Sequence, residues 1–149
     1  MEILVREFEE ADKEALGLLY VASRNATFTW NPAELHQISD FDLHTKDERV
    51  LVALSDQKIL GFASIWEPDS FLHNLFVHPS AIRRGIGQAL LNSCSNYFAN
   101  EPRLKCLTAN ENAVRFYKSQ GWRALHEDIG PEGPYILMAK AVEICPTNS

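Results

Sequence analysis

The chain has 149 residues, of which 46% are hydrophobic and 23% charged, and its formal net charge is −6. This length and composition are typical of one globular domain with a single core. The acidic balance argues against nucleic acid as the main partner, because phosphate backbones select basic surfaces. The sequence also contains no apolar run near the roughly 20 residues that span a bilayer.

Hydrophobic periodicity predicts the element order β-α-α-β-β-β-α-β-α-β-β, with no internal repeat or linker. The helical period is lost near Asn31, and Pro32 suits the first turn of a second helix. The order indicates an α/β domain over residues 1–141, a mixed sheet flanked by helices, followed by a tail over 142–149. The expected elements are a strand over 3–8, a helix from 11 through 20, a helix over 32–43, strands over 50–54, 59–66 and 71–77, a helix over 87–98, a strand over 104–108, a helix over 112–120 and strands over 122–125 and 135–139.

A glycine-rich loop between an expected strand and an expected helix predicts a phosphate site. The apolar run 75–77 ends at His78-Pro79, and the loop 82–87, Ile-Arg-Arg-Gly-Ile-Gly, precedes an amphipathic segment. The first N–H groups of a helix are unpaired and carry partial positive charge, so they can hold an anion. Glycine lets the backbone approach that anion, and Arg83 and Arg84 add full charges. An ordinary corner, with glycines chosen only for packing, is the alternative.

The loop resembles motif A of the GNAT acetyltransferase superfamily, Gln/Arg-x-x-Gly-x-Gly/Ala, with Ile82 at the first position. A second stretch resembles motif B, N-x-x-A-x-x-F-Y-x-x-x-G-F. Taken alone, the second stretch describes only an amphipathic helix with a glycine cap. Two motifs in the right order, with one strand between them, are far more specific. The matching residues of motif B are Asn110, Ala113, Phe116, Tyr117 and Gly121, with Trp122 for the final Phe.

The resemblance implies a mostly antiparallel sheet, acetyl-coenzyme A as donor, no metal, and N-acetyl transfer by direct attack of an amine in a ternary complex. The strands over 71–77 and 104–108 are then expected to splay apart, with the pantetheine arm lying between them like an added strand. The expected donor-binding residues are Phe76, Val77, Arg83, Arg84, Gly85, Ile86, Gly87, Gln88, Ala89, Asn110 and Tyr117.

Tyr117 occupies the position of the motif B tyrosine, which in this family usually lies near the thiol sulfur. The resemblance therefore implies that Tyr117 is the acid that protonates the leaving thiolate. An ordinary tyrosine has a pKa near 10 and is protonated at neutral pH. A role in packing alone is the alternative for this residue.

His73 is the first candidate for the base that deprotonates the incoming amine. Strand alternation predicts that its side chain shares a face with Leu75 and Val77, and an ordinary histidine titrates near neutral pH. Some amine-specific members of the superfamily are similar in placing a histidine at this point. Glu67 or Asp69, directly or through water, are the alternatives, and His73 as a bystander stays open.

The acceptor pocket is expected to come from the first half of the chain. Aromatic side chains can line a pocket and bind a cation, although core packing is an equally simple reason for them. The acceptor is expected to be a small-molecule amine or a peptide amine. The candidate residues are Phe28, Trp30, Glu67 and Phe71, with Trp66 and Tyr135 as further possibilities.

Other functions remain open on the same residues. A non-catalytic module that binds or senses acyl-coenzyme A would keep the loop but lack a productive acid and base. A dinucleotide site would need a third glycine where Leu90 stands, and a P-loop would need Gly-Lys-Ser/Thr. A toxin-like acetyltransferase acting on charged transfer RNA would be expected to need a basic surface.

The cysteines and the first residues favour a reducing cytoplasm. Cys94, Cys106 and Cys145 are scattered without metal-type spacing, and such residues usually behave as small hydrophobes or free thiols. The opening residues lack the basic flank and long apolar region of a signal peptide. Many proteins of this fold form dimers, so a homodimer is also left open.

Overall fold

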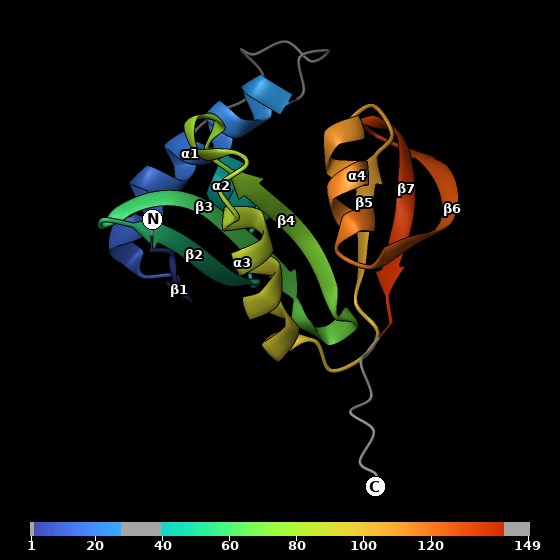
Figure 1. Ribbon diagram of the computed structural model, residues 1–149, viewed down its shortest axis with the longest axis horizontal. Coiled ribbons are helices and arrows are strands. Elements are labelled where there is room, and N and C mark those ends of the chain that lie inside the picture. The colour runs from blue at the N-terminus through green and yellow to red at the C-terminus, as the bar shows by residue number, and fades with distance from the viewer. Residues whose placement is uncertain (1, 28–39, 142–149) are drawn as a thin grey trace, which may run out of the picture.

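The computed structural model describes residues 2–27 and 40–141. In these residues seven strands form one sheet in the order β1-β2-β3-β4-β5-β7-β6 (Figure 1). The α/β architecture and the mostly antiparallel pairing predicted from the sequence are confirmed. The elements are β1 (Leu4–Glu7), α1 (Lys13–Thr27), α2 (Asp40–His44), β2 (Arg49–Ser55), β3 (Lys58–Trp66), β4 (Phe71–Val77), α3 (Ile86–Cys94), β5 (Arg103–Leu107), α4 (Glu111–Ser119), β6 (Trp122–Gly130) and β7 (Gly133–Lys140).

Some boundaries differ from the sequence prediction. β6 extends to Gly130, whereas the sequence predicted that it ends at position 125. The prediction was too short because the side chains are exposed along most of the strand and show no apolar alternation. The helix expected over 87–98 ends at Cys94 and passes into a short 3-10 turn. Most of the helix expected over 32–43 and the whole tail 142–149 lie outside the described residues.

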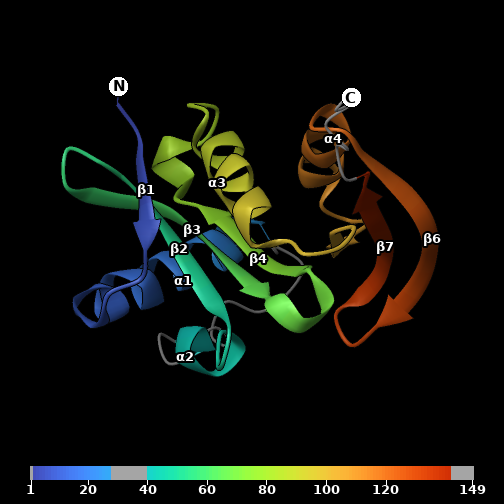
Figure 2. The ribbon, with the colours of Figure 1, turned by 90° about the horizontal axis from the view of Figure 1, so that it is seen from below.

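Two apolar clusters hold the helices on opposite faces of the sheet (Figure 2). The larger cluster lies under α3 and α4 and includes Leu90 and Trp122. The smaller cluster joins α1 and α2 to the other face, where the ring centroids of Phe41 and Phe62 are 5.2 Å apart. Burial of apolar surface is the main favourable term in folding, so these clusters fix the helices that flank the middle of the sheet. No helix in the described ranges is long and apolar enough to cross a membrane.

β4 and β5 are parallel neighbours that pair only at their first residues. Phe71 pairs with Arg103 and Leu72 with Leu104, and the pairing ends there. Beyond this point the two strands diverge toward their carboxyl ends, as Figure 1 shows. The splay predicted from the sequence is confirmed. It leaves backbone groups on the facing strand edges without a ladder partner, and such groups need another hydrogen-bond partner or water.

Asp12 ties the start of α1 to β1. Its carboxylate accepts hydrogen bonds from the Arg6 guanidinium at 2.8 and 3.0 Å and from the backbone N–H of Glu9 at 2.8 Å. The Asp12 side chain is only 7% exposed. The hydrogen bonds from Arg6, more than any other cause, hold the pKa of Asp12 below its ordinary value. The ionised carboxylate therefore stabilises the folded state.

We expect Asp12→Asn to lower the free energy of unfolding at pH 7 by about 2 kcal/mol, the usual scale for losing hydrogen bonds to a charged group. A carboxyl whose pKa is lower in the folded state contributes stability above its unfolded pKa and loses it as the pH falls through the folded pKa. The difference between wild type and variant should therefore shrink below about pH 4. Urea unfolding of both proteins between pH 7 and pH 3 measures this difference in the free energy of unfolding.

Glu9→Gln is the matched control, because the Glu9 carboxylate is 3.9 Å from the Arg6 guanidinium and is 67% exposed. Exposed pairs of this kind contribute little to stability. A loss in Asp12→Asn that stays constant across this pH range would contradict the assignment.

Candidate functional site

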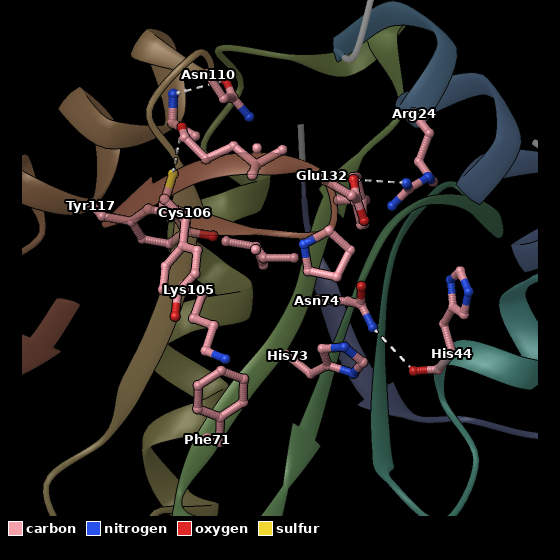
Figure 3. Close-up of a pocket in the computed structure, with 18 of the residues that line it drawn as sticks. Arg24, His44, Phe71, His73, Asn74, Lys105, Cys106, Asn110, Tyr117 and Glu132 are labelled. Atoms are coloured by element: carbon pink, nitrogen blue, oxygen red, sulfur yellow. Dashed lines mark hydrogen bonds and ion pairs between the residues drawn. The ribbon is translucent and has the colours of Figure 1, made fainter. Parts of the chain in front are cut away.

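A cavity of about 650 Å³ lies where β4 and β5 diverge. Figure 3 shows side chains reaching it from α1, β4, β5, α4 and the turn between β6 and β7. Its volume is within the range of about 300–1,000 Å³ that is common for small-molecule sites. The splayed strands thus create a pocket in the middle of the sheet, not at its outer edges.

The cavity brings together predicted site residues from distant parts of the chain. The predicted site residues that line it are Phe71, His73, Phe76, Asn110 and Tyr117, together with Tyr135. Asn110 also caps α4, since its side-chain oxygen accepts the backbone N–H of Ala113 at 3.3 Å. The candidate base thus shares one space with some of the donor and acceptor candidates.

Other predicted residues do not line this cavity. The Glu67 carboxylate accepts a hydrogen bond from Arg49 at 3.1 Å on the surface. Val77 lies at the end of β4, where its carbonyl accepts the Ser23 hydroxyl at 3.1 Å. Residues 83–89, which are the end of the loop before α3 and the first turn of that helix, are not part of the cavity lining. Phe28 and Trp30 lie outside the described residues.

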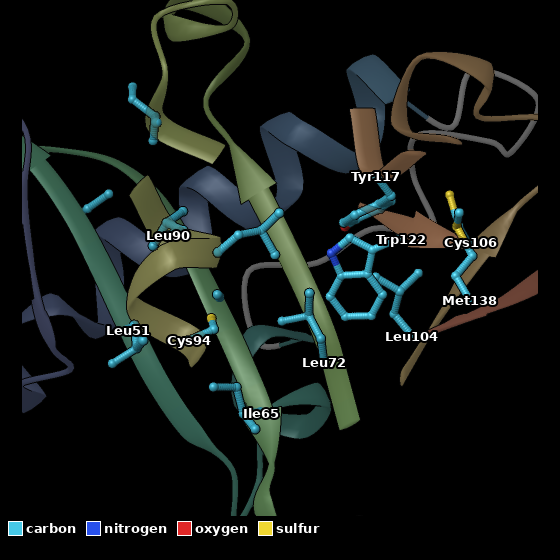
Figure 4. Packing of buried hydrophobic residues seen from close by; sticks show 14 of the residues in the cluster. Leu51, Ile65, Leu72, Leu90, Cys94, Leu104, Cys106, Tyr117, Trp122 and Met138 are labelled. Atoms are coloured by element: carbon cyan, nitrogen blue, oxygen red, sulfur yellow. The ribbon is translucent and has the colours of Figure 1, made fainter. Parts of the chain in front are cut away.

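Tyr117 forms a buried wall of the cavity. It is 8% exposed, and Figure 4 shows it beside Trp122, whose ring centroid is 6.0 Å away. Burial, followed by the neighbouring Cys106 and Cys94 thiols, raises the pKa of Tyr117. Its hydroxyl is therefore protonated throughout the neutral range, so it can donate a proton or a hydrogen bond.

Cys106 lines the same cavity but is not an activated nucleophile. Burial raises the pKa of the Cys106 thiol to about 11, and that of Cys94 to about 12. The reactive form of a cysteine is the thiolate, which is scarce at neutral pH in both side chains. Neither Cys94 nor Cys106 is therefore activated as a nucleophile.

His73 sits at an irregularity in β4. The register between β3 and β4 shifts at Ser64–Ile65, opposite His73, as at a β-bulge. The prediction that His73 shares a face with Leu75 and Val77 depended on regular alternation and is wrong. Those two side chains pack against the cluster under α3, whereas Nδ1 of His73 lies 2.7 Å from Oε2 of Glu48.

Two polar pairs at the cavity gave no signal in the sequence. Arg24 on α1 donates to Glu132 in the β6–β7 turn at 3.1 Å, across a separation of 108 residues. Nδ1 of His44 lies 2.6 Å from the Tyr20 hydroxyl, and both residues line the cavity. The sequence around His44 shows no pattern that indicates a function. These pairs arise only when the folded chain brings α1, α2 and the turn together.

Glycine is needed at positions 85 and 87 for two different structural reasons. Gly85 has φ +82°, a left-handed conformation that glycine adopts at little cost. At Gly87 a Cβ would lie 3.1 Å from Cζ of Phe116, so the glycine permits close packing of α3 and α4. Packing, the alternative left open by the sequence, therefore explains Gly87. The first N–H groups of α3 nevertheless have no acceptor inside the helix.

Arg83 and Arg84 lie exposed beside this helix end. Neither makes an ion pair with another residue of the described ranges. Arg83 also has φ +66°, a conformation uncommon for a residue with a side chain. The helix end and the two guanidinium groups together form a positively charged site on an acidic protein.

The chain matches the family described as Acetyltransferase (GNAT) family over residues 6–122. It belongs to this family, as the two motifs predicted. The chain therefore has the fold of the GNAT acetyltransferases.

One curated relative is the peptidyl-lysine N-acetyltransferase YiaC of Escherichia coli (strain K12), 42% identical over 67 residues. The match covers 45% of this chain and 44% of that protein, so it spans less than half of the relative's length.

Solved structures share the fold over nearly the whole chain. A GCN5-related N-acetyltransferase from Rhodopseudomonas palustris is 20% identical, with a TM-score of 0.80 and coverage of 95% of this chain and 97% of that one. The PaiA N-acetyltransferase from Thermoplasma acidophilum, in complex with coenzyme A, is also 20% identical, with a TM-score of 0.76 and coverage of 95% and 100%. At this identity the likeness shows the fold.

Proposed function

We propose that this protein moves an acetyl group from acetyl-coenzyme A to a primary amine by direct attack in a ternary complex. The observation that carries the proposal is the cavity between β4 and β5, which is lined by both a protonated phenol, Tyr117, and an imidazole, His73. The likeness to a peptidyl-lysine acetyltransferase supports the lysine ε-amine of a peptide as the first acceptor to test. Small-molecule amines come second.

The residues present fit the donor. The β4–β5 ladder ends at Leu72 and Leu104, and the diverging strand edges beyond it suit the amides of a pantetheine arm. Phe76 lines the cavity on the β4 side. The N-terminus of α3 with Arg83 and Arg84 suits a pyrophosphate. Asn110 and Tyr117 line the same cavity. When bound, acetyl-coenzyme A supplies an acetyl group activated as a thioester.

His73 and Tyr117 then account for the two proton movements. The C–N bond forms as the C–S bond breaks, His73 accepts the proton lost by the amine, and Tyr117 donates a proton toward the departing sulfur. A phenol with a raised pKa gives up its proton reluctantly. The raised pKa of Cys106 indicates that the cavity disfavours thiolates as well, which increases the proton affinity of a departing sulfur in the same space. Solvent restores both side chains after release.

We expect Arg84→Glu to weaken acetyl-coenzyme A binding at least about 10-fold, because a charge reversal beside a phosphate site costs more than about 1.4 kcal/mol at partly screened distances. Titration calorimetry at low salt measures the change. Arg84→Glu is a sharper test than a bulky residue at position 87, which would clash with Phe116 and disturb packing. The effect should shrink as salt is added.

Arg123→Glu is the matched control. Arg123 is an exposed residue of β6 that pairs with Glu101 at 3.3 Å, away from α3. Equal affinities of wild type and Arg84→Glu for acetyl-coenzyme A would contradict the phosphate assignment. An equal loss of affinity in Arg84→Glu and Arg123→Glu would also contradict it, because the loss would then be a general effect of net charge.

A thermal-shift panel followed by thiol detection tests the function. A ligand at 100 times its Kd stabilises a protein by about 2.7 kcal/mol, which is several degrees for a domain of this size. We expect shifts with acetyl-coenzyme A and coenzyme A but not with NADH or ATP. Release of thiol on adding a lysine peptide or an amine then supports transfer. Binding without thiol release across all amines would favour an acyl-coenzyme A sensing module.

We further propose that residues 1–141 form one catalytic domain that works in the cytoplasm. Cys94 and Cys106 are free and buried, as expected for a compartment in which thiols stay reduced. Fractionation of cells that express the tagged protein measures its location, and recovery in a secreted fraction would contradict this proposal.

A further inference from the structure

We propose that Glu48 is a positioning residue that holds the His73 imidazole with its proton on Nδ1 and its basic nitrogen, Nε2, available to the cavity. The inference rests on the proposed function, in which His73 accepts a proton from the amine. Glu48 belongs to neither sequence motif. It precedes β2 and does not line the cavity itself.

The contact between the two side chains has the geometry of a charge-assisted hydrogen bond. Nδ1 of His73 is 2.7 Å from Oε2 of Glu48, within the range for a nitrogen donor and a carboxylate. A neutral imidazole that donates from Nδ1 has its lone pair on Nε2. Nε2 makes no hydrogen bond with any residue of the described ranges. The tautomer that Glu48 selects is thus the one that a base requires.

The His73 side chain is more exposed than the Glu48 side chain, as a base and its positioning residue require. The His73 side chain is 45% exposed and lines the cavity, whereas the Glu48 side chain is only 8% exposed. Solvent and substrate therefore reach the imidazole but not the carboxylate behind it. Phe71 flanks the imidazole, with ring centroids 6.4 Å apart. The ring of His73 is held between an aromatic neighbour and a buried anion.

A rigid turn holds the carboxylate in place. The backbone N–H of Glu48 donates to the carbonyl of Thr45 at 3.0 Å, and the Thr45 hydroxyl donates to the carbonyl of Phe41 at 2.7 Å. Asp47 adopts φ +63°, which turns the chain sharply before Glu48. The turn joins α2 to β2, so two packed elements fix its ends. Glu48 therefore has little freedom to leave the imidazole.

The second carboxylate oxygen of Glu48 gives the strongest physical reason for the proposed role. Oε1 of Glu48 is buried without a hydrogen-bond partner among the described residues. A buried, incompletely paired carboxylate costs stability unless a positive charge lies beside it. A positive charge forms there when His73 accepts a proton. The carboxylate thus stabilises the imidazolium more than the neutral imidazole, in the way that an orienting aspartate assists a catalytic histidine.

The first test is nitrogen NMR of protein labelled at histidine, with the His73 signals assigned by their loss in His73→Ala. We expect neutral wild-type His73 to carry its proton on Nδ1. In Glu48→Gln the side-chain amide can donate to Nδ1, so the proton should shift to Nε2. A proton on Nε2 in the wild-type protein would overturn the proposal. This wild-type result needs neither acetyl transfer nor a folded Glu48 variant.

The second test is steady-state kinetics of Glu48→Gln with acetyl-coenzyme A and a lysine peptide. For this partly exposed histidine we expect kcat to fall about 10- to 100-fold. This is a smaller loss than the fall in kcat that follows when the orienting aspartate of a buried catalytic triad is replaced by an amide. The KM for acetyl-coenzyme A should stay within about twofold, because Glu48 does not line the cavity.

Glu101→Gln makes the same change of charge in a surface pair with Arg123 and should leave kcat unchanged. Unchanged kcat in Glu48→Gln, with an active wild type, would overturn the positioning role. A wild type that transfers no acetyl group would instead overturn the proposed function, and the NMR measurement would still decide the state of His73.

Discussion

Replacing Tyr117 by phenylalanine should lower kcat about 100-fold, within the usual range for loss of a general acid. The phenyl ring would keep the contacts with Trp122 and Phe116, whose ring centroids lie 6.0 and 5.4 Å from that of Tyr117. Only the hydroxyl is removed, so we expect the affinity for acetyl-coenzyme A to change by less than about threefold. Steady-state kinetics and calorimetry together separate the two effects.

The pH dependence adds a second observable for Tyr117. An acid works only while it is protonated, and burial raises the pKa of Tyr117 above the ordinary value near 10. Loss of its proton should therefore produce no decline in kcat on the alkaline side below about pH 10.

Tyr97→Phe is the control for Tyr117→Phe. Its ring lies under the Arg49 guanidinium at 4.5 Å, outside the cavity. Equal turnover of wild type and Tyr117→Phe would remove Tyr117 as the acid and leave it a packing residue.

Replacing His73 by alanine should also lower kcat about 100-fold near neutral pH, the usual scale for loss of a general base. In the wild type, turnover should decline on the acid side as the imidazole becomes protonated and can no longer accept the amine's proton. In His73→Ala that decline should disappear or move. Profiles of kcat against pH for both proteins measure this difference.

His126→Ala is the matched control, because it removes the same side chain from an exposed position on β6. It should reproduce the wild-type profile. A wild-type profile in His73→Ala would make His73 a bystander and return attention to Asp69 and Glu67, although Glu67 is bound to Arg49 on the surface.

Features that depend on near neighbours could be predicted from the sequence. The Asn110 cap, the helix that carries Tyr117 and the glycine that ends it lie within one short stretch. Gly121 indeed has the positive φ of a helix-terminating glycine. The element order followed from local periodicity in the same way. Such signals need no knowledge of the rest of the fold.

Features that depend on tertiary contacts could not be predicted in this way. Glu48 and His73 are 25 residues apart, and a bulge in β4 reverses the face that alternation assigns to His73. Arg24 and Glu132 are farther apart still. The sequence also could not separate packing from ligand binding at Gly87, because a close approach of Phe116 and a phosphate site demand the same residue.

The most direct test is mass spectrometry of a lysine peptide with a blocked N-terminus after incubation with the protein and acetyl-coenzyme A, with small primary amines assayed in parallel. We expect one acetyl group on the lysine ε-amine or on one of the small amines, at a rate strongly reduced in Tyr117→Phe. A protein that binds acetyl-coenzyme A in calorimetry but acetylates no amine would contradict the proposed function. Acetylation at the same rate by Tyr117→Phe would contradict the assigned chemistry.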